Sequence, residues 1–261
     1  MSLSPTDSGR RLHAVIRRFL LAAVVACGAR GSIALAASVE VTPTTLTLSS
    51  TSPTELLTVR NLGLEDLRFE VNVSAWRQAP DGASVLTPND DIIFFPQLMK
   101  VPAGASAKIR IGATDSPGAA EKAYRLLLQE LPQLTTPGDN LKIQVLTAQS
   151  IPIFVAPPEP RTSVQIDAFA LTPGTIAFTL SNTGTRHLLA DTIRVIGADA
   201  SGAQVFAQTA NSWYLLARGS RDYKLPVSAS ECMRSHGFRV EVVADQQTFE
   251  QSFSSAPGRC R

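Results

Sequence analysis

The residue types that most often perform catalysis are sparse in this sequence. After residue 36 the only histidines are His187 and His236, and no Gly-x-Ser-x-Gly, phosphate-loop or metal-ligand spacing occurs. Solvated loops explain the acidic pairs Glu65-Asp66 and Asp90-Asp91 better than metal or acid–base chemistry, because neither pair has a partner histidine. His187 is interpreted as a turn or packing residue. We therefore expect no enzyme, no catalytic residue, no metal and no cofactor.

The first segment of the chain has the organisation of an export signal. Its basic part contains Arg10, Arg11, Arg17 and Arg18. The apolar run Phe19 to Ala26 and the small-residue site Ala34-Leu35-Ala36 follow, so residues 1–36 are predicted to be removed, which leaves Ala37 first. A competing interpretation takes Val24-Val25-Ala26-Cys27 as a lipoprotein box with Cys27 acylated; the full Ala-x-Ala site downstream favours the first. No later stretch has the roughly 20 apolar residues of a membrane helix, so no membrane insertion is expected after signal removal.

Signal removal would leave Cys232 and Cys260 as the cysteines of the exported chain. Export brings a protein into an oxidising compartment, where disulfides persist. We therefore expect one disulfide between Cys232 and Cys260. Two unpaired thiols are the alternative.

Length and composition predict two folded domains. The chain has 261 residues, of which 44% are hydrophobic and 18% are charged. It is too long for one sandwich of about 100 to 150 residues, and it has enough apolar side chains for real cores. The net charge of +2 includes several arginines of the first segment, so the rest of the chain is near neutral and nucleic-acid binding is not indicated.

Strand patterns fill the chain from Ser38 onward, and amphipathic helical patterns are hard to find. In Leu67 to Trp76, apolar residues alternate with polar ones, which predicts a strand with one buried face. Further strands are expected within residues 107–111, 124–128, 164–171, 175–182, 192–196, 204–208 and 238–243. Short strands at this spacing indicate an all-β fold of two immunoglobulin-like β-sandwiches.

Three prolines in Pro157-Pro158-Glu159-Pro160 mark a boundary between the two halves. Such a segment cannot join a β-ladder and forms a stiff connector. We therefore expect an N-terminal domain over residues 37–156, a linker over 157–160 and a C-terminal domain over 161–261.

The segment Leu141 to Val155 reads as one continuous strand of unusual length. Leu141, Ile143 and Val145 share a parity with Ile151, which the domain's own sheet could occupy. The first three would then be apolar side chains on a bare edge, and such an edge is a hazard unless a partner uses it.

At this point the sequence resembles the periplasmic chaperones of the chaperone-usher pilus pathway, the PapD-like family, over nearly all of the exported chain. The motifs that carry the resemblance are Ile93-Phe94-Phe95-Pro96-Gln97, Val101-Pro102-Ala103-Gly104, Ile109-Arg110-Ile111-Gly112, Glu121-x-x-Tyr124-Arg125-x-Leu127, Glu130-x-Pro132, Ile151-Pro152-Ile153-Phe154-Val155-x-Pro157 and Asn182-x-Gly184-x-x-His187. The resemblance implies two immunoglobulin-like domains in an L-shaped arrangement. It also implies a periplasmic location, with pilus subunits and an outer-membrane usher as partners.

The family holds an incomplete pilin by adding a strand to the pilin's sheet. Residue by residue, the resemblance makes Leu141, Ile143 and Val145 the donors. The alternative that all three face the domain's own core stays open, because a bulge can shift the parity.

The subunit anchor resembles that of the archaic branch of the family. In the best-known branch an arginine of the first strand and a lysine of the long strand hold the subunit. Here Ser38 to Leu48 has no arginine, and the lysine position falls on Pro152. The archaic branch uses an arginine and an aromatic residue to hold the subunit's terminal carboxylate, which implies Arg125 and Trp76. A solvated arginine and an exposed tryptophan packing on a neighbour are the competing interpretation.

Two anchor candidates would come next if Arg125 were not the site: Lys142 and Arg110. Tyr124 is interpreted as structural, because a tyrosine near the start of this strand can bond back to the preceding corner.

The expected function is capture of pilus subunits by donor-strand complementation and their delivery to the usher. The alternative is an exported tandem immunoglobulin-like module that binds a carbohydrate or protein ligand through its loops, which Trp213-Tyr214 keeps open. The sequence does not identify the pilin, self-association or the surface that contacts the usher.

Overall fold

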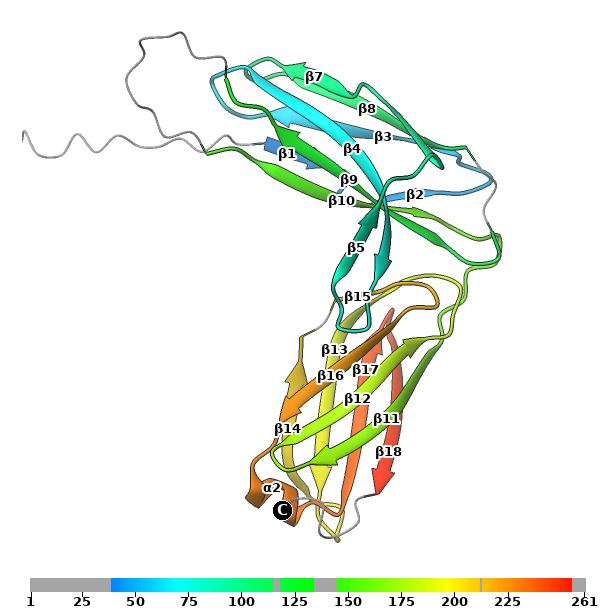
Figure 1. The fold of residues 1–261 in the computed structure, drawn as a ribbon, viewed down its shortest axis with the longest axis vertical. Coiled ribbons are helices and arrows are strands. Elements are labelled where there is room, and N and C mark those ends of the chain that lie inside the picture. Colours follow the sequence, from blue (N-terminus) through cyan, green and yellow to red (C-terminus); the bar gives the residue numbers. More distant parts are fainter. Residues whose placement is uncertain (1–38, 115–117, 134–144, 212, 255–261) are drawn as a thin grey trace, which may run out of the picture. The chain divides into compact units, whose positions relative to one another are not determined.

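The computed structural model describes residues 39–114, 118–133, 145–211 and 213–254 (Figure 1). Residues Ala37–Arg261 form one compact unit. The predicted signal, its cleavage site and Cys27 lie outside the described residues. Among the described residues, none of the helices has the length and apolar character needed to span a membrane.

The first sandwich contains ten strands. They are β1 (Val39–Thr42), β2 (Leu46–Leu48), β3 (Thr54–Asn61), β4 (Leu67–Gln78), β5 (Ser84–Thr87), β6 (Ile92–Phe95), β7 (Leu98–Val101), β8 (Ser106–Ala113), β9 (Lys122–Glu130) and β10 (Ala148–Val155). One sheet has the order β1-β3-β8-β6, and the other has the order β2-β10-β9-β4-β5 with β7 also paired to β4. The strand β9 therefore lies between β4 and β10.

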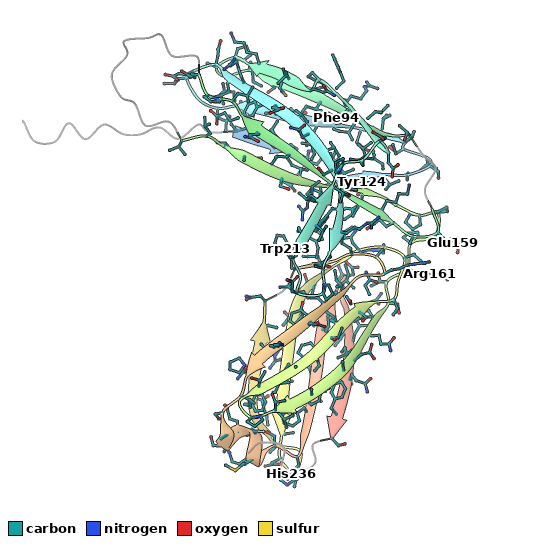
Figure 2. All side chains as sticks on the ribbon, in the orientation of Figure 1. Phe94, Tyr124, Glu159, Arg161, Trp213 and His236 are labelled. Carbon is teal, nitrogen blue, oxygen red and sulfur yellow. The ribbon has the colours of Figure 1, made fainter. Side chains whose placement is uncertain are left out.

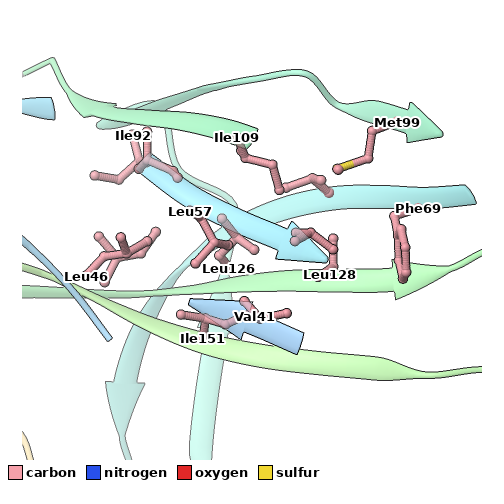
Figure 3. Packing of buried hydrophobic residues seen from close by; sticks show 14 of the residues in the cluster. Val41, Leu46, Leu57, Phe69, Ile92, Met99, Ile109, Leu126, Leu128 and Ile151 are labelled. Atoms are coloured by element: carbon pink, nitrogen blue, oxygen red, sulfur yellow. The ribbon is translucent and has the colours of Figure 1, made fainter. Parts of the chain in front are cut away.

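Alternation along the strands builds the first core. Leu57 of β3 and Ile109 of β8 face Phe69 of β4 and Leu126 of β9, so the inner faces of both sheets meet (Figure 3). Burying one such side chain contributes about 1.5 to 3 kcal/mol. The residues of opposite parity on β4 and β9 point away from this core.

The second sandwich repeats the plan. Its elements are β11 (Val164–Thr172), β12 (Thr175–Asn182), β13 (Leu188–Ala198), β14 (Gln204–Ala210), β15 (Tyr214–Leu215), β16 (Ser220–Pro226), α2 (Ala229–Arg234), β17 (Gly237–Ala244) and β18 (Gln247–Ser254). The sheets have the orders β11-β12-β16 and β14-β13-β17-β18, with β15 paired to β13. A separate core lies between them. The predicted all-β fold of two immunoglobulin-like sandwiches is confirmed, whereas the domain and linker boundaries remain a prediction.

The helix α2 was not expected from the sequence. Ser228 is its N-cap: the Ser228 hydroxyl accepts from Glu231 N–H, and Glu231 accepts from Ser228 N–H. This Ser-x-x-Glu capping box is a recognisable start signal. The helix is too short to show an amphipathic period, so the periodicity of the sequence does not reveal it.

The expectation of one strand over Leu141 to Val155 is wrong for its described part. The strand β10 begins at Ala148, and residues 145–147 belong to no strand. Pairing stops there because β9 ends at Glu130, whose carboxylate accepts from Thr147 N–H at 2.9 Å. Residues 141–144 lie outside the described residues.

Both sandwiches contain the same asparagine corner. Asn61, at the end of β3, accepts from Gly63 N–H at 2.9 Å and donates to Val101 O at 3.1 Å. Asn182, at the end of β12, accepts from Gly184 N–H at 2.9 Å and donates to Leu215 O at 3.1 Å. The Asn-x-Gly turns seen in the sequence are therefore buried corners that fasten one strand to the next.

Candidate functional site

A buried cation lies in a group of aromatic rings beside the first sandwich. The guanidinium of Arg125 is 3.7 Å from the centroid of the Trp76 ring, and the side chains of Trp76 and Phe154 are buried. Tyr214 of the second sandwich completes the group, with its ring 5.6 Å from Trp76 and 5.7 Å from the guanidinium. The structure therefore brings Arg125 and Trp76 together, as the sequence predicted, and adds two rings that the sequence did not assign.

The register of the sheet explains the position of Arg125. Arg125 of β9 lies opposite Ser74 of β4 and Pro152 of β10. Both neighbours have short side chains, so the guanidinium has room to turn toward Trp76, which projects from the same face of β4. The position of the other branch's lysine, Pro152, is thus the direct cross-strand neighbour of Arg125.

The second sandwich covers this face of the sheet. Gln78, at the end of β4, donates from Nε2 to Tyr214 O at 2.7 Å and accepts from Leu216 N–H at 3.4 Å. These bonds hold β15 against β4 and place the ring of Tyr214 near Arg125. As a result Trp76 is 3% exposed and Arg125 is 8% exposed. The interpretation of a solvated arginine and an exposed tryptophan is therefore wrong.

Arg125 has no anionic partner among the described residues. No hydrogen bond or ion pair there involves its guanidinium, whose recorded contacts are the rings of Trp76 and Tyr214. Burial lowers the pKa of Arg125 from its usual value, partly opposed by Tyr214, and an arginine nonetheless stays charged. No fully enclosed side-chain nitrogen among the described residues lacks a hydrogen bond, so the N–H groups of Arg125 still reach solvent. The site can accept an anion.

A histidine and a glutamate lie next to the aromatic group. His187 stacks on Phe154 at 3.6 Å between ring centroids, and its Nδ1 is 2.7 Å from Glu121 Oε1. The same carboxylate oxygen accepts from His187 N–H at 2.9 Å. These contacts agree with the packing interpretation of His187.

Asp91 is a partly exposed loop residue, as expected, and it also has side-chain partners. Its carboxylate accepts from the Tyr124 hydroxyl at 2.7 Å and from Lys122 Nζ at 3.2 Å. Figure 2 labels Tyr124 among the side chains of the first sandwich. The bond from Tyr124, followed by the bond from Lys122, lowers the pKa of Asp91. Tyr124 is structural as predicted, but this bond joins it to a side chain, which spacing alone could not indicate.

A pocket of about 600 Å³ lies beside the aromatic group. Trp76 and Tyr124 contribute to its lining, together with Arg77 of β4 and Arg218 of the turn after β15. Among the described residues no group of three or more His, Cys, Asp or Glu side chains could hold a metal ion.

The predicted donor residues are described only at one end. Val145 is 64% exposed and belongs to neither core, so the alternative that it faces the domain's own core is wrong for this residue. Leu141 and Ile143 lie outside the described residues.

The remaining predicted residues are only partly described. Lys142 and Cys260 lie outside the described residues, and Cys232 is buried in the second core, so the disulfide remains a prediction. Arg110 belongs to β8 in the other sheet and does not join the group around Arg125.

Solved structures share this fold. The archaic-pilus chaperone CsuC of Acinetobacter baumannii, solved with the tip subunit CsuE, superposes with a TM-score of 0.57 at 16% identity over 82% of this chain and 97% of that one. The class 5 fimbriae chaperone CfaA gives a TM-score of 0.59 at 15% identity over 84% and 100%. SafB of Salmonella enterica, in complex with the pilin SafA, gives 0.56 at 14% identity over 83% and 96%. At these identities the likeness shows the fold.

The two comparisons of sequence gave one match. No curated protein matches the chain. The family model described as "Pili and flagellar-assembly chaperone, PapD N-terminal domain" matches residues 38–161, a segment that contains Arg125, Trp76 and all strands of the first sandwich. The resemblance predicted from the sequence is confirmed for the first sandwich, which matches the model of the PapD N-terminal domain of pilus-assembly chaperones.

Proposed function

We propose that this protein is a periplasmic chaperone that captures pilus subunits by donor-strand complementation, holds their C-terminal carboxylate at Arg125 and delivers them to an outer-membrane usher. One observation carries the proposal: Arg125 is a buried cation without an anionic partner in the described part of the PapD-type chain. Burying an unpaired charge is costly, and a protein tolerates that cost where a ligand later neutralises the charge.

The aromatic rings suit Arg125 to a carboxylate. With one face of the planar guanidinium stacked on Trp76, its edges remain for the paired hydrogen bonds that a carboxylate accepts. Since Pro152 lies directly opposite Arg125, the cation that the other branch carries on the long strand is supplied here from the neighbouring strand. Both arrangements put a positive charge at the same level of the sheet.

The start of β10 supports the strand-donation part of the proposal. Val145 is exposed although it is apolar, and it precedes the strand whose continuation would add to an incomplete pilin. The donors proposed are Leu141, Ile143 and Val145. Complexes of neighbouring folds, CsuC with CsuE and SafB with SafA, support a pilus subunit as the partner. We propose no catalytic activity and no cofactor.

The anchor is tested by the dissociation constant for a pilus subunit that co-purifies with the exported protein, or for the C-terminal peptide of that subunit. Arg125→Ala should weaken binding by about 2 to 5 kcal/mol, because the carboxylate is left buried without its partner. Arg125→Lys should restore part of the affinity, since a point charge replaces a two-pronged donor. Arg239→Ala, which removes an exposed arginine of the second sandwich, is the matched control. Equal affinity of all these proteins would remove Arg125 from the site.

Strand donation is tested by Ile143→Asp and Val145→Asp. Each should leave the circular dichroism spectrum unchanged and abolish pull-down of the subunit, because an unpaired charge cannot enter an apolar groove. Thr147→Asp is the control. Thr147 lies directly before the chaperone's own strand β10, and its N–H already bonds to Glu130 of the chaperone. Unfolding of the aspartate variants would instead assign these side chains to the chaperone's core.

A further inference from the structure

The pocket beside Trp76 contains two arginines that the carboxylate anchor does not use. Arg77 lies near the end of β4, and Arg218 lies in the turn between β15 and β16. Both are exposed, and neither forms an ion pair among the described residues. Two separate segments of the chain therefore bring an unneutralised guanidinium to the same pocket.

The acidic residues of the pocket are already engaged. Asp91 accepts from Tyr124 and Lys122, and Glu121 accepts from His187. The lining also includes Lys122, so three cations, Arg77, Lys122 and Arg218, stand against the two carboxylates. The pocket therefore has an excess of positive charge, which an anion would balance.

The backbone at Arg218 is unusual for a residue with a side chain. The turn closes through a bond from Gly219 N–H to Leu216 O at 2.9 Å, and Arg218 has φ = 58°. The third position of a turn with positive φ is usually glycine or asparagine. An arginine there is strained, because its Cβ crowds the backbone at positive φ, and such local strain is found at functional sites.

The pocket adjoins the anchor. Trp76 stacks on Arg125 and also lines the pocket, which has a volume of about 600 Å³. One side chain therefore contacts both the cation that would hold a terminal carboxylate and the neighbouring cavity.

We propose that the pocket binds a side-chain carboxylate of the captured subunit, in the segment just before the subunit's C-terminus, through Arg77 and Arg218. This inference rests on the proposed chaperone function and extends it, because it gives the protein a way to select subunits by an acidic residue in that segment. Arg125 would bind only the terminal carboxylate, which every subunit has. Discrimination between subunits must come from other contacts.

The test uses the exported chain and two peptides from the C-terminus of a pilus subunit that co-purifies with it: the natural peptide, and one whose Asp and Glu side chains are replaced by Asn and Gln. Arg77→Ala and Arg218→Gly are the variants. Arg218→Gly also relieves the positive φ, so its fold should be retained. Arg239→Ala controls for loss of an exposed arginine.

Each variant should weaken binding of the natural peptide by about tenfold, the effect of one charge-assisted hydrogen bond pair. Wild type should bind the neutral peptide about tenfold more weakly than the natural one. The variants should bind both peptides equally weakly, which is the coupling expected of a direct contact. Variants that bind the natural peptide within about twofold of wild type would overturn the inference. So would a natural peptide without Asp or Glu that binds tightly.

Arg125→Ala distinguishes the two proposals. If it abolishes binding while Arg77→Ala and Arg218→Gly do not weaken it, the pocket inference fails and the chaperone function stands. If wild type binds neither the pilin nor its peptide, the chaperone function itself fails.

Discussion

The two sandwiches share their scaffold but differ in the surroundings of an arginine on one central strand of each. In the first, β9 lies between β4 and β10; in the second, β17 lies between β13 and β18. Each sandwich has the same buried asparagine corner, with bonds of nearly equal length. Arg239 of β17 pairs with Glu241 at 2.9 Å, whereas Arg125 of β9 lies buried against aromatic rings without an anionic partner in the described part.

This difference separates what the fold requires from what function requires. The asparagine corner occurs in both halves because it satisfies buried backbone carbonyls, which every such sandwich must do. An unpaired buried arginine satisfies no such need, and it occurs in only one of the two comparable strands. The corner therefore belongs to the fold, whereas the unpaired arginine belongs to the proposed binding site.

The largest effect expected in this comparison is confined to the second sandwich. Reduction of the predicted Cys232–Cys260 disulfide should lower the free energy of unfolding by about 3 to 4 kcal/mol, because an unbridged unfolded chain gains entropy. Urea unfolding with and without a reductant measures the change. Thiol labelling of the denatured, unreduced protein is the control, and two labelled cysteines would refute the bridge.

The asparagine corners should have equal effects in the two halves. Asn61→Ala and Asn182→Ala should each lower the free energy of unfolding by about 1 to 3 kcal/mol, because a buried carbonyl loses its donor. Chemical denaturation of both variants tests this, with the exposed Asn72→Ala as the matched control. If one corner variant lowers the free energy of unfolding no more than Asn72→Ala does, that corner does not support its sandwich.

The two arginines should respond in opposite ways to replacement by methionine. Arg125→Met should raise the stability of the free protein by about 1 kcal/mol while abolishing subunit binding, because removing a buried unpaired charge outweighs the lost contact with Trp76. Arg239→Met should lower stability by at most about 1 kcal/mol, since its ion pair is exposed. Thermal unfolding and pull-down measure both. A marked loss of stability in Arg125→Met would make Arg125 a structural residue.

The smallest effect concerns acid stability and the first sandwich. The bond from Tyr124 lowers the pKa of Asp91 in the folded protein, so Asp91 stabilises the fold above its unfolded pKa of about 3.9 and stops doing so as the pH falls through its lower folded pKa. The free energy of unfolding of Asp91→Asn should therefore fall less below about pH 4 than that of the wild type. Unfolding free energies between neutral pH and pH 3 test this, with Asp90→Asn as the control in the same loop. An unchanged acid profile would contradict it.

The sequence by itself determined the all-β class, the buried faces of the clearest strands and the resemblance to the PapD-like chaperones. Alternation of apolar and polar residues is enough to define which side chains of β4 and β9 face the core, because successive side chains of a strand point to opposite faces. The motif around Tyr124 and Arg125 was likewise readable, since it is local. The short helix α2 escaped because its capping signal at Ser228 is local but its length shows no period.

Only the tertiary structure decided what covers the other face. Parity placed Trp76 and Arg125 on the polar side of their strands, which suggested solvent. Gln78 instead fastens β15 against β4, so that Tyr214 closes over both side chains. The contacts of that face come from a segment far along the chain, and a period of two residues within one strand carries no information about a distant partner.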